Sequence, residues 1–341
     1  MTRVLVTGAT GFIAAHAIAD LLAHGYDVRG TVRSRPKALL EAALSRLPGA
    51  ERLELVEADL MNDNSFDKPA QGCDAVFHMA SPYVVNVKDP QRDLVDPAVN
   101  GTLNVLNAAA KSGSVKRVVL TSSMAAITDE PPSDHALTER DWNHKSTLKR
   151  NPYYFSKTQA EKAAWRFMEE AKPGFDLVVI NPFLVIGPSY TRSLNESNKM
   201  LADMTKGVYP GVLALAWGFV DVRDVARAHV LALETPDASG RYLCSGDILS
   251  MRQTLAALKT ALPNAKLPRI ALDNSFGTTF VKLVSFTQPA GVGSYLRSHL
   301  GRRLRYDNGK IRRELKLTFR PATAAVADAV ADLVKWGHIK A

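Results

Sequence analysis

A tyrosine and a lysine that stand four positions apart, Tyr153 and Lys157, could together deliver a proton to a carbonyl oxygen. Residues at this spacing lie one turn apart on the same face of a helix. The ordinary pKa of a tyrosine is about 10, and a neighbouring lysine cation lowers it by stabilising the phenolate. The spacing alone has little specificity, since Tyr306 and Lys310 repeat it. The position of each pair in the fold must therefore decide between them.

Tyr153 falls between the fifth and sixth strands of an alternating strand and helix pattern. Ser123 follows the fifth strand, at the edge where ligands bind in parallel sheets. A serine hydroxyl there can hold a substrate carbonyl within reach of Tyr153, whereas Ser122 should point to the opposite face. We therefore predict Ser123, Tyr153 and Lys157 as the catalytic residues. The second tyrosine and lysine pair lies far from the sheet, in a basic segment, and we interpret it as a coincidence.

Residues 7–14, Thr-Gly-Ala-Thr-Gly-Phe-Ile-Ala, form a turn between the first predicted strand and the first predicted helix. Gly8 permits a tight turn, and Gly11 lets a diphosphate approach the backbone because it has no side chain. The helix that follows offers free N–H groups and the positive end of its dipole to the phosphates. This context makes the turn a strong dinucleotide signal. The predicted contacts in it are Gly8, Thr10, Gly11, Phe12 and Ile13.

The residues after the second predicted strand favour NADPH over NADH. NAD-binding proteins carry Asp or Glu there to bind the ribose hydroxyls, whereas residues 31–37 contain three cations and no acid. The guanidinium of Arg33 can pair with a 2′-phosphate, with Lys37 nearby; the alternative is a solvated basic loop. Further cofactor contacts are predicted after strands three to five, at Asp59, Leu60, Ala80, Ser81 and Thr121. Asp59 could instead cap a loop, and we interpret His78 as a core histidine.

Two apolar periods alternate through the first 180 residues. Short apolar runs predict buried strands, and stripes at helical spacing predict helices between them. The predicted strands are 4–6, 28–32, 53–56, 75–79, 118–121 and 177–180, and the predicted helices are 12–24, 36–47, 94–112 and 152–171. This order predicts an α/β fold, a Rossmann-type doubly wound parallel sheet with right-handed crossovers.

The C-terminal half has a less regular pattern. Residues 187–218 indicate a loop with short helices, and residues 263–305 show no clear period. Helices are predicted at 221–234, 251–262, 307–315 and 322–336, and a strand at 241–245. We predict an NADP-binding domain over residues 1–182, to which residues 219–246 return. Residues 183–341 should form a smaller, irregular and mainly substrate-binding region.

Composition and charge exclude several classes of protein. The chain has 341 residues, 46% hydrophobic and 23% charged, as in an ordinary globular protein. Most of its net charge of +9 lies in residues 297–320, which show no recognised nucleic-acid-binding module, so we expect no nucleic-acid partner.

No apolar run approaches the ~18 residues of a membrane span, and the N-terminus shows no secretory pattern, so we expect no membrane partner. Cys73 and Cys244 lack disulfide-framework and metal-ligand spacing, which fits a cytoplasmic protein without a metal site.

The chain resembles the extended short-chain dehydrogenases/reductases, in the branch of dihydroflavonol reductases, cinnamoyl-CoA reductases and microbial NADPH-dependent carbonyl reductases. Three further segments carry the resemblance: 101–106 (Gly-Thr-Leu-Asn-Val-Leu), 181–188 (Asn-Pro and Gly-Pro at its ends) and 220–226 (Val-Asp-Val-Arg-Asp-Val-Ala). It covers essentially the whole chain. The resemblance implies hydride transfer from NADPH to an aldehyde or ketone by a Ser/Tyr/Lys mechanism. It also implies that Lys157 holds the nicotinamide ribose and that Pro182 and Val185 line the nicotinamide.

Two signatures depart from those of the plant relatives. Five residues after Ser123, where flavonol-type enzymes carry a substrate-binding asparagine, this chain has Thr128. The cinnamoyl-CoA signature Asn-Trp-Tyr-Cys-Tyr-Gly-Lys reads Asn-Pro-Tyr-Tyr-Phe-Ser-Lys at residues 151–157. We therefore expect a generic carbonyl reductase with an apolar or aromatic small-molecule substrate. The candidate substrate contacts, each of which could instead belong to the core, are Tyr83, Thr128, Phe183 and Trp217.

Two other functions stay open at this point. A nucleotide-sugar epimerase or dehydratase of the same fold usually has an acid after the second strand, which this chain lacks. Its Thr-Asp-Glu at residues 128–130 stands five residues beyond the Ser123 position, so we interpret it as a coincidence. A catalytically silent NADP-binding regulator commonly loses the catalytic tyrosine, which is present here as Tyr153. We expect a monomer or a homodimer.

Overall fold

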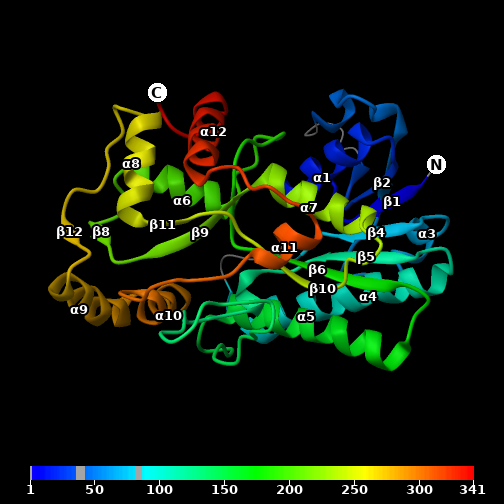
Figure 1. Cartoon of the computed structure of the whole chain (residues 1–341), viewed down its shortest axis with the longest axis horizontal. Helices are drawn as coiled ribbons and strands as arrows, with labels where there is room; N and C mark the ends of the chain where they lie inside the picture. The colour runs from blue at the N-terminus through cyan, green and yellow to red at the C-terminus, as the bar shows by residue number, and fades with distance from the viewer. Residues whose placement is uncertain (1, 36–42, 82–86) are drawn as a thin grey trace.

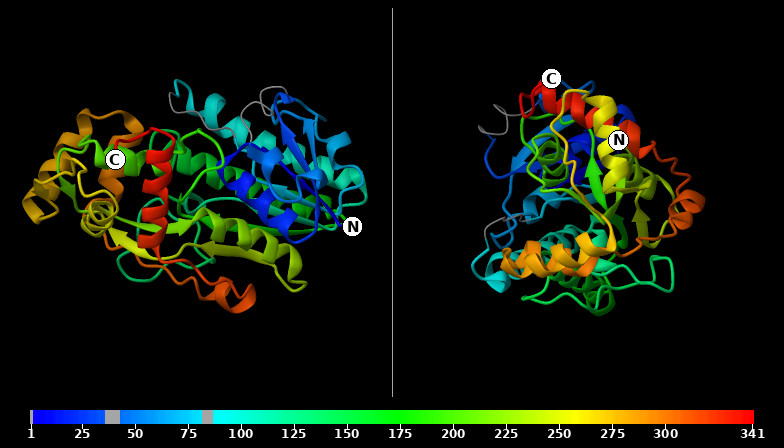
Figure 2. Two further views of the ribbon diagram at one scale, coloured as in Figure 1. Left: turned by 90° about the horizontal axis from the view of Figure 1, so that it is seen from above. Right: turned by 90° about the vertical axis from the view of Figure 1, so that its left-hand side faces the viewer.

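The computed structural model describes residues 2–35, 43–81 and 87–341, which form two parts side by side (Figure 1). One part is a large sheet covered by helices, and it holds the N-terminus. The other part is a smaller assembly of short strands and helices at the opposite end of the molecule (Figure 2). Its segments come from the second half of the chain.

Seven parallel strands form the large sheet, in the order β10-β6-β5-β4-β1-β2-β3. Their bounds are β1 Arg3–Val6, β2 Asp27–Val32, β3 Leu53–Glu57, β4 Ala75–His78, β5 Arg117–Thr121, β6 Asp176–Pro182 and β10 Gly240–Cys244. Short apolar strands of this kind are typical of a parallel sheet that is buried on both faces. The topology confirms the predicted Rossmann-type α/β fold.

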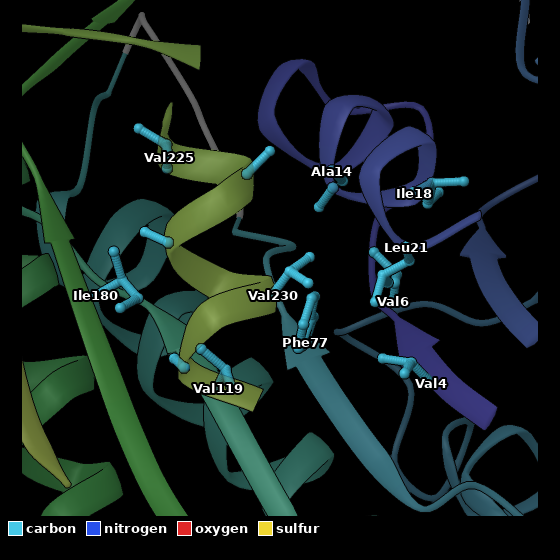
Figure 3. Close-up of a cluster of buried hydrophobic side chains, with 14 of the residues drawn as sticks. Val4, Val6, Ala14, Ile18, Leu21, Phe77, Val119, Ile180, Val225 and Val230 are labelled. Atoms are coloured by element: carbon cyan, nitrogen blue, oxygen red, sulfur yellow. The ribbon is translucent and has the colours of Figure 1, made fainter. Parts of the chain in front are cut away.

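Alternate residues of each strand pack on opposite faces of the sheet. Val4, Val6 and Phe77 belong to a core cluster with helices α1 and α7, and Figure 3 shows these side chains pointing toward the two helices. Leu5 and Val76 belong to a second cluster, with α4 and α5. The bounds are α1 Phe12–Ala23, α3 Asp67–Ala70, α4 Asp96–Ser112, α5 Pro152–Ala171, α7 Val222–Glu234 and α11 Gly309–Glu314. The sheet is therefore the middle layer of a three-layer sandwich, with helices on both faces. Its buried strands fix the positions of the loops that leave their carboxyl ends.

The smaller part has its own apolar core, to which Trp217, Phe219 and Leu258 contribute. Its strands are β7 Leu184–Ile186, β8 Val212–Leu213, β9 Ala216–Asp221, β11 Ile248–Ser250 and β12 Ala271–Leu272. Its helices are α6 Glu196–Thr205, α8 Met251–Ala261, α9 Ser275–Val284, α10 Ala290–His299 and α12 Ala322–Lys335. Since β7 follows β6 almost directly, this part begins at the carboxyl edge of the large sheet.

The structure differs from the sequence prediction mainly in the second half. Residues 263–305, which show no clear period, contain α9 and α10. Residues 187–218 contain the short helix α6, in agreement with the prediction, and also β8 and the start of β9. Helix α9 has no clear apolar period because its aromatic residues Phe276 and Phe280 are exposed. Its buried residue is Gly277, which lies close to the backbone of Leu272. Its apolar residues therefore do not mark its buried face. The first seven residues of the helix predicted at 36–47 lie outside the described residues.

In the described ranges, no helix combines the length and the apolar character that a membrane crossing requires. The same residues contain no group of three or more His, Cys, Asp or Glu side chains that could hold a metal ion.

Candidate active site

Helix α5 begins at the residues that carry the candidate chemistry. Asn151 lies in the left-handed region, with φ 49° and ψ 61°, and Pro152 takes the first helical position, where its fixed φ suits a helix. The buried carboxylate of Asp129 accepts a hydrogen bond from the Asn151 side chain. Side-chain contacts thus fix the start of the helix whose first two turns present Tyr153 and Lys157.

Ser123 lies just after β5 and meets Tyr153. A hydrogen bond joins the two side chains, and Ser123 Oγ also accepts from the backbone N–H of Ala125 at 3.1 Å, at the start of a short 3-10 helix. Burial raises the pKa of Tyr153 to about 12, and the hydrogen bond with Ser123 opposes that rise in part. The pKa of Tyr153 is therefore raised, and not lowered by Lys157 as the spacing predicted. At neutral pH the phenol keeps its proton and can donate it.

Lys157 lies one turn after Tyr153 on the same helix face. Its Nζ is 5.9 Å from the centroid of the Tyr153 ring and donates to Ser81 Oγ at 2.8 Å. Burial lowers the pKa of Lys157 to about 8, so the ammonium still predominates at neutral pH. The structure brings Ser81, Ser123, Tyr153 and Lys157 together where β4 and β5 end.

The glycine turn lies beside this group. Gly8 has a φ of +70°, and a Cβ there would lie 3.1 Å from the Cβ of Ala80. Gly11 donates its backbone N–H to Gly8 O at 2.8 Å, which closes the turn. Within the described residues no side chain caps α1, so its first N–H groups are available to an anion. The other predicted contacts in the turn, all partly buried, are Thr10, Phe12 and Ile13.

Thr7 connects the turn to the end of β4. Its Oγ1 accepts from the backbone N–H groups of Met79 at 3.0 Å and Ala80 at 2.9 Å. The hydroxyl proton is then donated to His78 Nδ1 at 3.0 Å. Burial lowers the pKa of His78 to about 3, and the side chain is 2% exposed, which confirms a core histidine. This network holds Ala80 and Ser81 beside the glycine turn.

The predicted adenine end of the site lies beyond β2 and β3. Arg33 is exposed, and the next cation, Arg35, donates its backbone N–H to Glu57 at 3.0 Å. Asp59 accepts from the backbone N–H of Met61 at 3.0 Å. This contact agrees with the alternative that Asp59 caps a loop instead of binding the adenine. Lys37 lies outside the described residues.

The remaining predicted cofactor contacts lie in tightly packed surroundings. Leu60 packs against Gly101, where a Cβ would come within 3.1 Å of the leucine Cβ. The hydroxyl of Thr121 pairs with His229 Nε2 at 2.7 Å, while His229 Nδ1 donates to a backbone carbonyl of α7. Pro182 ends β6, and Val185 is 7% exposed in β7.

The candidate substrate residues are spread over different surroundings. Trp217 is 3% exposed and donates from Nε1 to the hydroxyl of Tyr295 at 2.8 Å, so it belongs to the core of the smaller part. Phe183 is half-buried between two apolar clusters. Tyr83 lies outside the described residues, and its substrate contact stays a prediction.

Residues 128–130 have structural partners. Thr128 is buried, and its hydroxyl donates to Glu130 O at 2.9 Å and accepts from Glu130 N at 3.1 Å. The Asp129 and Glu130 carboxylates each accept from Arg150 at 2.6 Å, and Glu130 also pairs with Arg302. These acids hold the segment before α5, which supports the interpretation of Thr-Asp-Glu as a coincidence.

The second tyrosine and lysine pair does not form a site of the same kind. Tyr306 precedes α11, and its hydroxyl contacts Ser245 Oγ at 2.8 Å. Lys310 lies in α11 and donates to the backbone oxygens of Ser239 at 2.8 Å and Arg241 at 2.9 Å. The two side chains are therefore committed to different contacts. The prediction that this pair lies far from the sheet was wrong, because Lys310 contacts the edge strand β10 and Tyr306 contacts the residue after it.

One end of the basic stretch lies closer to the catalytic helix than the sequence indicated. Ser298 Oγ accepts from the Asn151 side chain at 3.2 Å, and the ring of His299 lies 6.0 Å from that of Tyr154. Helix α10 thus packs on the start of α5. Several cations of the stretch have intramolecular partners, such as Asp224 for Arg320 and Glu130 for Arg302.

Sequence reasoning missed two buried residues behind the candidate catalytic group. Glu161 stands four positions after Lys157, and its side chain is 0% exposed. Asn181 is also 0% exposed, and its Nδ2 donates to both Ser123 O at 3.1 Å and Glu161 at 2.8 Å. The available signal was the continued four-residue spacing after Tyr153, which places an acid on the same helix face.

Comparison with known proteins identifies the family of the chain. Residues 4–244 match the model of the NAD dependent epimerase/dehydratase family. The chain is 42% identical to cinnamoyl-CoA reductase CAD2 of Medicago truncatula, over 80% of this chain and 84% of that protein. It is 40% identical to tetraketide alpha-pyrone reductase 1 of Arabidopsis thaliana, over 78% and 83% of the two chains.

Solved structures resemble this one over nearly its whole length. Gre2 from Candida albicans in complex with NADPH gives a TM-score of 0.82 at 31% identity, over 98% of this chain and 99% of that one. Vestitone reductase from alfalfa, Medicago sativa, gives a TM-score of 0.77 at 28% identity, over 99% and 100%. These likenesses confirm the resemblance inferred from the motifs, and the chain belongs to the NAD dependent epimerase/dehydratase family, among the extended short-chain dehydrogenases/reductases.

Proposed function

We propose that this protein is an NADPH-dependent reductase that converts an aldehyde or ketone to an alcohol. The observation that carries the proposal is the hydrogen-bonded Ser123 and Tyr153 pair, with Lys157 one turn away and the glycine turn beside it. The cinnamoyl-CoA reductase and the tetraketide alpha-pyrone reductase to which the chain is similar support carbonyl reduction. The Gre2 complex supports NADPH as the cofactor.

The residues of the glycine turn fit a dinucleotide. Gly8 leaves space beside Ala80 that a Cβ would fill, and the uncapped start of α1 offers N–H groups to a diphosphate. The exposed guanidinium of Arg33 fits a 2′-phosphate. Ser81 and Lys157 would hold the nicotinamide ribose, and Thr121, Pro182 and Val185 would border the nicotinamide. When bound, NADPH supplies the hydride.

Each residue of the catalytic group then has one task. Tyr153 donates its phenolic proton to the carbonyl oxygen, and Ser123 donates a hydrogen bond to the same oxygen. The Lys157 cation stabilises the phenolate that is left behind. Holding the carbonyl against both the hydride donor and the acid supplies much of the rate gain, because the reacting groups are already aligned.

The substrate is proposed to be a small apolar or aromatic carbonyl compound. Thr128 in place of the asparagine, and the altered sequence at residues 151–157, favour a general carbonyl reductase over the specialised plant activities. We also propose that residues 1–182, with 219–246, bind the cofactor, and that residues 183–341 mainly bind substrate.

The direct test follows NADPH absorbance with a panel of aldehydes, diketones, keto esters and aryl ketones, in parallel with NADH. We expect turnover of at least one carbonyl class, faster with NADPH than with NADH at equal concentration. Absence of turnover in every class, with NADPH binding intact, would contradict the proposed activity. Equal rates with both cofactors would contradict the proposed cofactor preference.

A further inference from the structure

A buried carboxylate on the catalytic helix contacts side chains that lie on β6, on β10 and directly after β5. Glu161 lies two turns after Tyr153 and one turn after Lys157, so the three residues share a helix face. Its Oε2 accepts from Ser122 Oγ at 2.5 Å and from Asn181 Nδ2 at 2.8 Å. The proposed mechanism assigns no task to this carboxylate, although burying a charge is costly unless it is well paired.

The other oxygen of the carboxylate is also satisfied. Glu161 Oε1 accepts from Arg241 Nε at 2.6 Å and from Trp165 Nε1 at 3.3 Å. Arg241 lies on β10, 7% exposed, and its Nη1 donates to the backbone oxygens of Glu139 at 3.0 Å and Asp141 at 2.6 Å. The carboxylate therefore joins α5 to β5, β6, β10 and the segment before α5.

Two of these contacts lead to the catalytic serine. Ser122 directly precedes Ser123, and its hydroxyl donates to Glu161. Asn181 uses the same Nδ2 group for Glu161 and for the carbonyl of Ser123, at 3.1 Å. Glu161 thus contacts both the residue that precedes Ser123 and the amide that donates to the Ser123 carbonyl.

We infer that Glu161 is a positioning residue that sets the distance between Ser123 on β5 and the Tyr153 and Lys157 pair on α5. The inference rests on the proposed function, since it assigns the task to that catalytic group. The tyrosine and the serine come from different elements, so their hydrogen bond depends on how α5 sits against β5. Glu161 is the side chain through which α5 holds both Ser122 and the amide that supports Ser123.

The variant Glu161→Gln tests this link because it keeps the size of the side chain. One carboxylate oxygen becomes an NH₂ group, and the charge of Arg241 favours keeping the remaining oxygen on its side. The NH₂ group then faces Asn181 Nδ2, donor against donor. Asn181 Oδ1, which is buried without a hydrogen-bond partner in the described part of the chain, can turn toward the new donor, and Nδ2 then leaves the Ser123 carbonyl.

We expect kcat of Glu161→Gln to fall roughly 10- to 100-fold, because small misplacements of reacting groups have effects of that size. NADPH affinity should stay within about twofold, since no cofactor contact is removed. The pH profile of the reverse reaction, alcohol oxidation, should move to higher pH. The reason is that the Ser123 hydrogen bond lowers the pKa of Tyr153, and oxidation needs the phenolate as base.

The matched control is Asp224→Asn, which removes a buried carboxylate whose hydrogen bonds are with Arg320 and not with the catalytic group. Asp224 on α7 is 2% exposed and accepts from the backbone N–H and the guanidinium of Arg320. It should lower the unfolding midpoint in urea and leave kcat and the pH profile unchanged. A purely structural role for Glu161 predicts the same behaviour in Glu161→Gln.

The second variant, Asn181→Ala, breaks the link at its other end. It should reproduce the loss of kcat and the pH shift, and the double variant should be no slower than the slower single variant. If Glu161→Gln does not fold, Asn181→Ala alone tests whether this link positions Ser123. Wild-type kcat in either variant, or a loss of kcat without a pH shift, would overturn the inference. Such a result with an active wild-type enzyme leaves the proposed function standing, whereas an inactive wild-type enzyme overturns that function itself.

Discussion

Lowering the pH from about 7.5 to about 5 should destabilise the folded protein, because four of its histidines are buried in the neutral form. All four are 7% exposed or less: His16, His78, His229 and His299. Burial lowers the pKa of His78 to about 3 and the pKa values of the other three to about 4. Their hydrogen bonds, such as that of His16 Nε2 with Pro188 O at 2.9 Å, fit neutral rings.

The sign follows from proton uptake by the unfolded chain. An unfolded histidine has a pKa of about 6.5, so the unfolded chain binds protons below that pH and the folded chain does not. The stability tied to these groups is complete above pH ~6.5 and is lost as the pH falls toward the folded pKa values. At about pH 5 each histidine costs about 2 kcal/mol relative to about pH 7.5. The sum, about 8 kcal/mol, is comparable to the whole stability of a typical domain.

The assay is urea unfolding, followed by tryptophan fluorescence at a series of pH values. His16→Gln keeps a donor for Pro188 O but does not titrate, and it should remove about 2 kcal/mol of the acid-induced loss. The control is His135→Gln, because His135 is exposed and its partners Asp141 and Asp134 raise its pKa. A free energy of unfolding that changes by less than about 2 kcal/mol over this pH range would refute the reasoning.

Three substitutions test the site. Arg33→Ala should weaken NADPH binding roughly 10- to 100-fold in a fluorescence titration, because it removes a charge-assisted contact, and should leave NADH within about twofold. Equal effects on both would contradict a 2′-phosphate contact. Gly8→Ala should lower the urea midpoint and NADPH affinity, since φ is +70° and the new Cβ meets Ala80; Gly72→Ala has the same φ in open space and should lower only the midpoint. Ser123→Ala should lower kcat roughly 100-fold in the NADPH assay with the Kd for NADPH unchanged, and unaltered kcat would exclude its proposed role.

The first half of the fold could be predicted because local signals and burial agree there. Helix α5 runs from Pro152 to Ala171 as predicted, since proline favours its first position and Pro173-Gly174 follow its end. Buried parallel strands need continuous apolar runs, which the sequence shows. In contrast, α9 buries a glycine and exposes its aromatic residues, so hydrophobic periodicity does not identify it.

The positions of Ser123, Tyr153 and Lys157 could be predicted from the strand and helix pattern, because Ser123 follows β5 and the other two lie in the first two turns of α5, and both elements have clear local signals. The buried residues behind them, Glu161 and Asn181, could not be predicted in this way. Glu161 depends on Arg241, which is distant along the chain and reaches it only when β10 joins the sheet beside β6. Pairings of this kind follow from the topology, and no local period marks them.

The central claim is that Tyr153 donates the proton in carbonyl reduction, and turnover of Tyr153→Phe tests it most directly. The matched control is Tyr306→Phe, which removes the same hydroxyl from the other tyrosine that precedes a lysine by four positions. We predict that Tyr153→Phe lowers kcat roughly 100- to 10,000-fold with NADPH affinity intact, while Tyr306→Phe retains turnover. Turnover of Tyr153→Phe within a few fold of the wild type, with NADPH bound, would contradict the account.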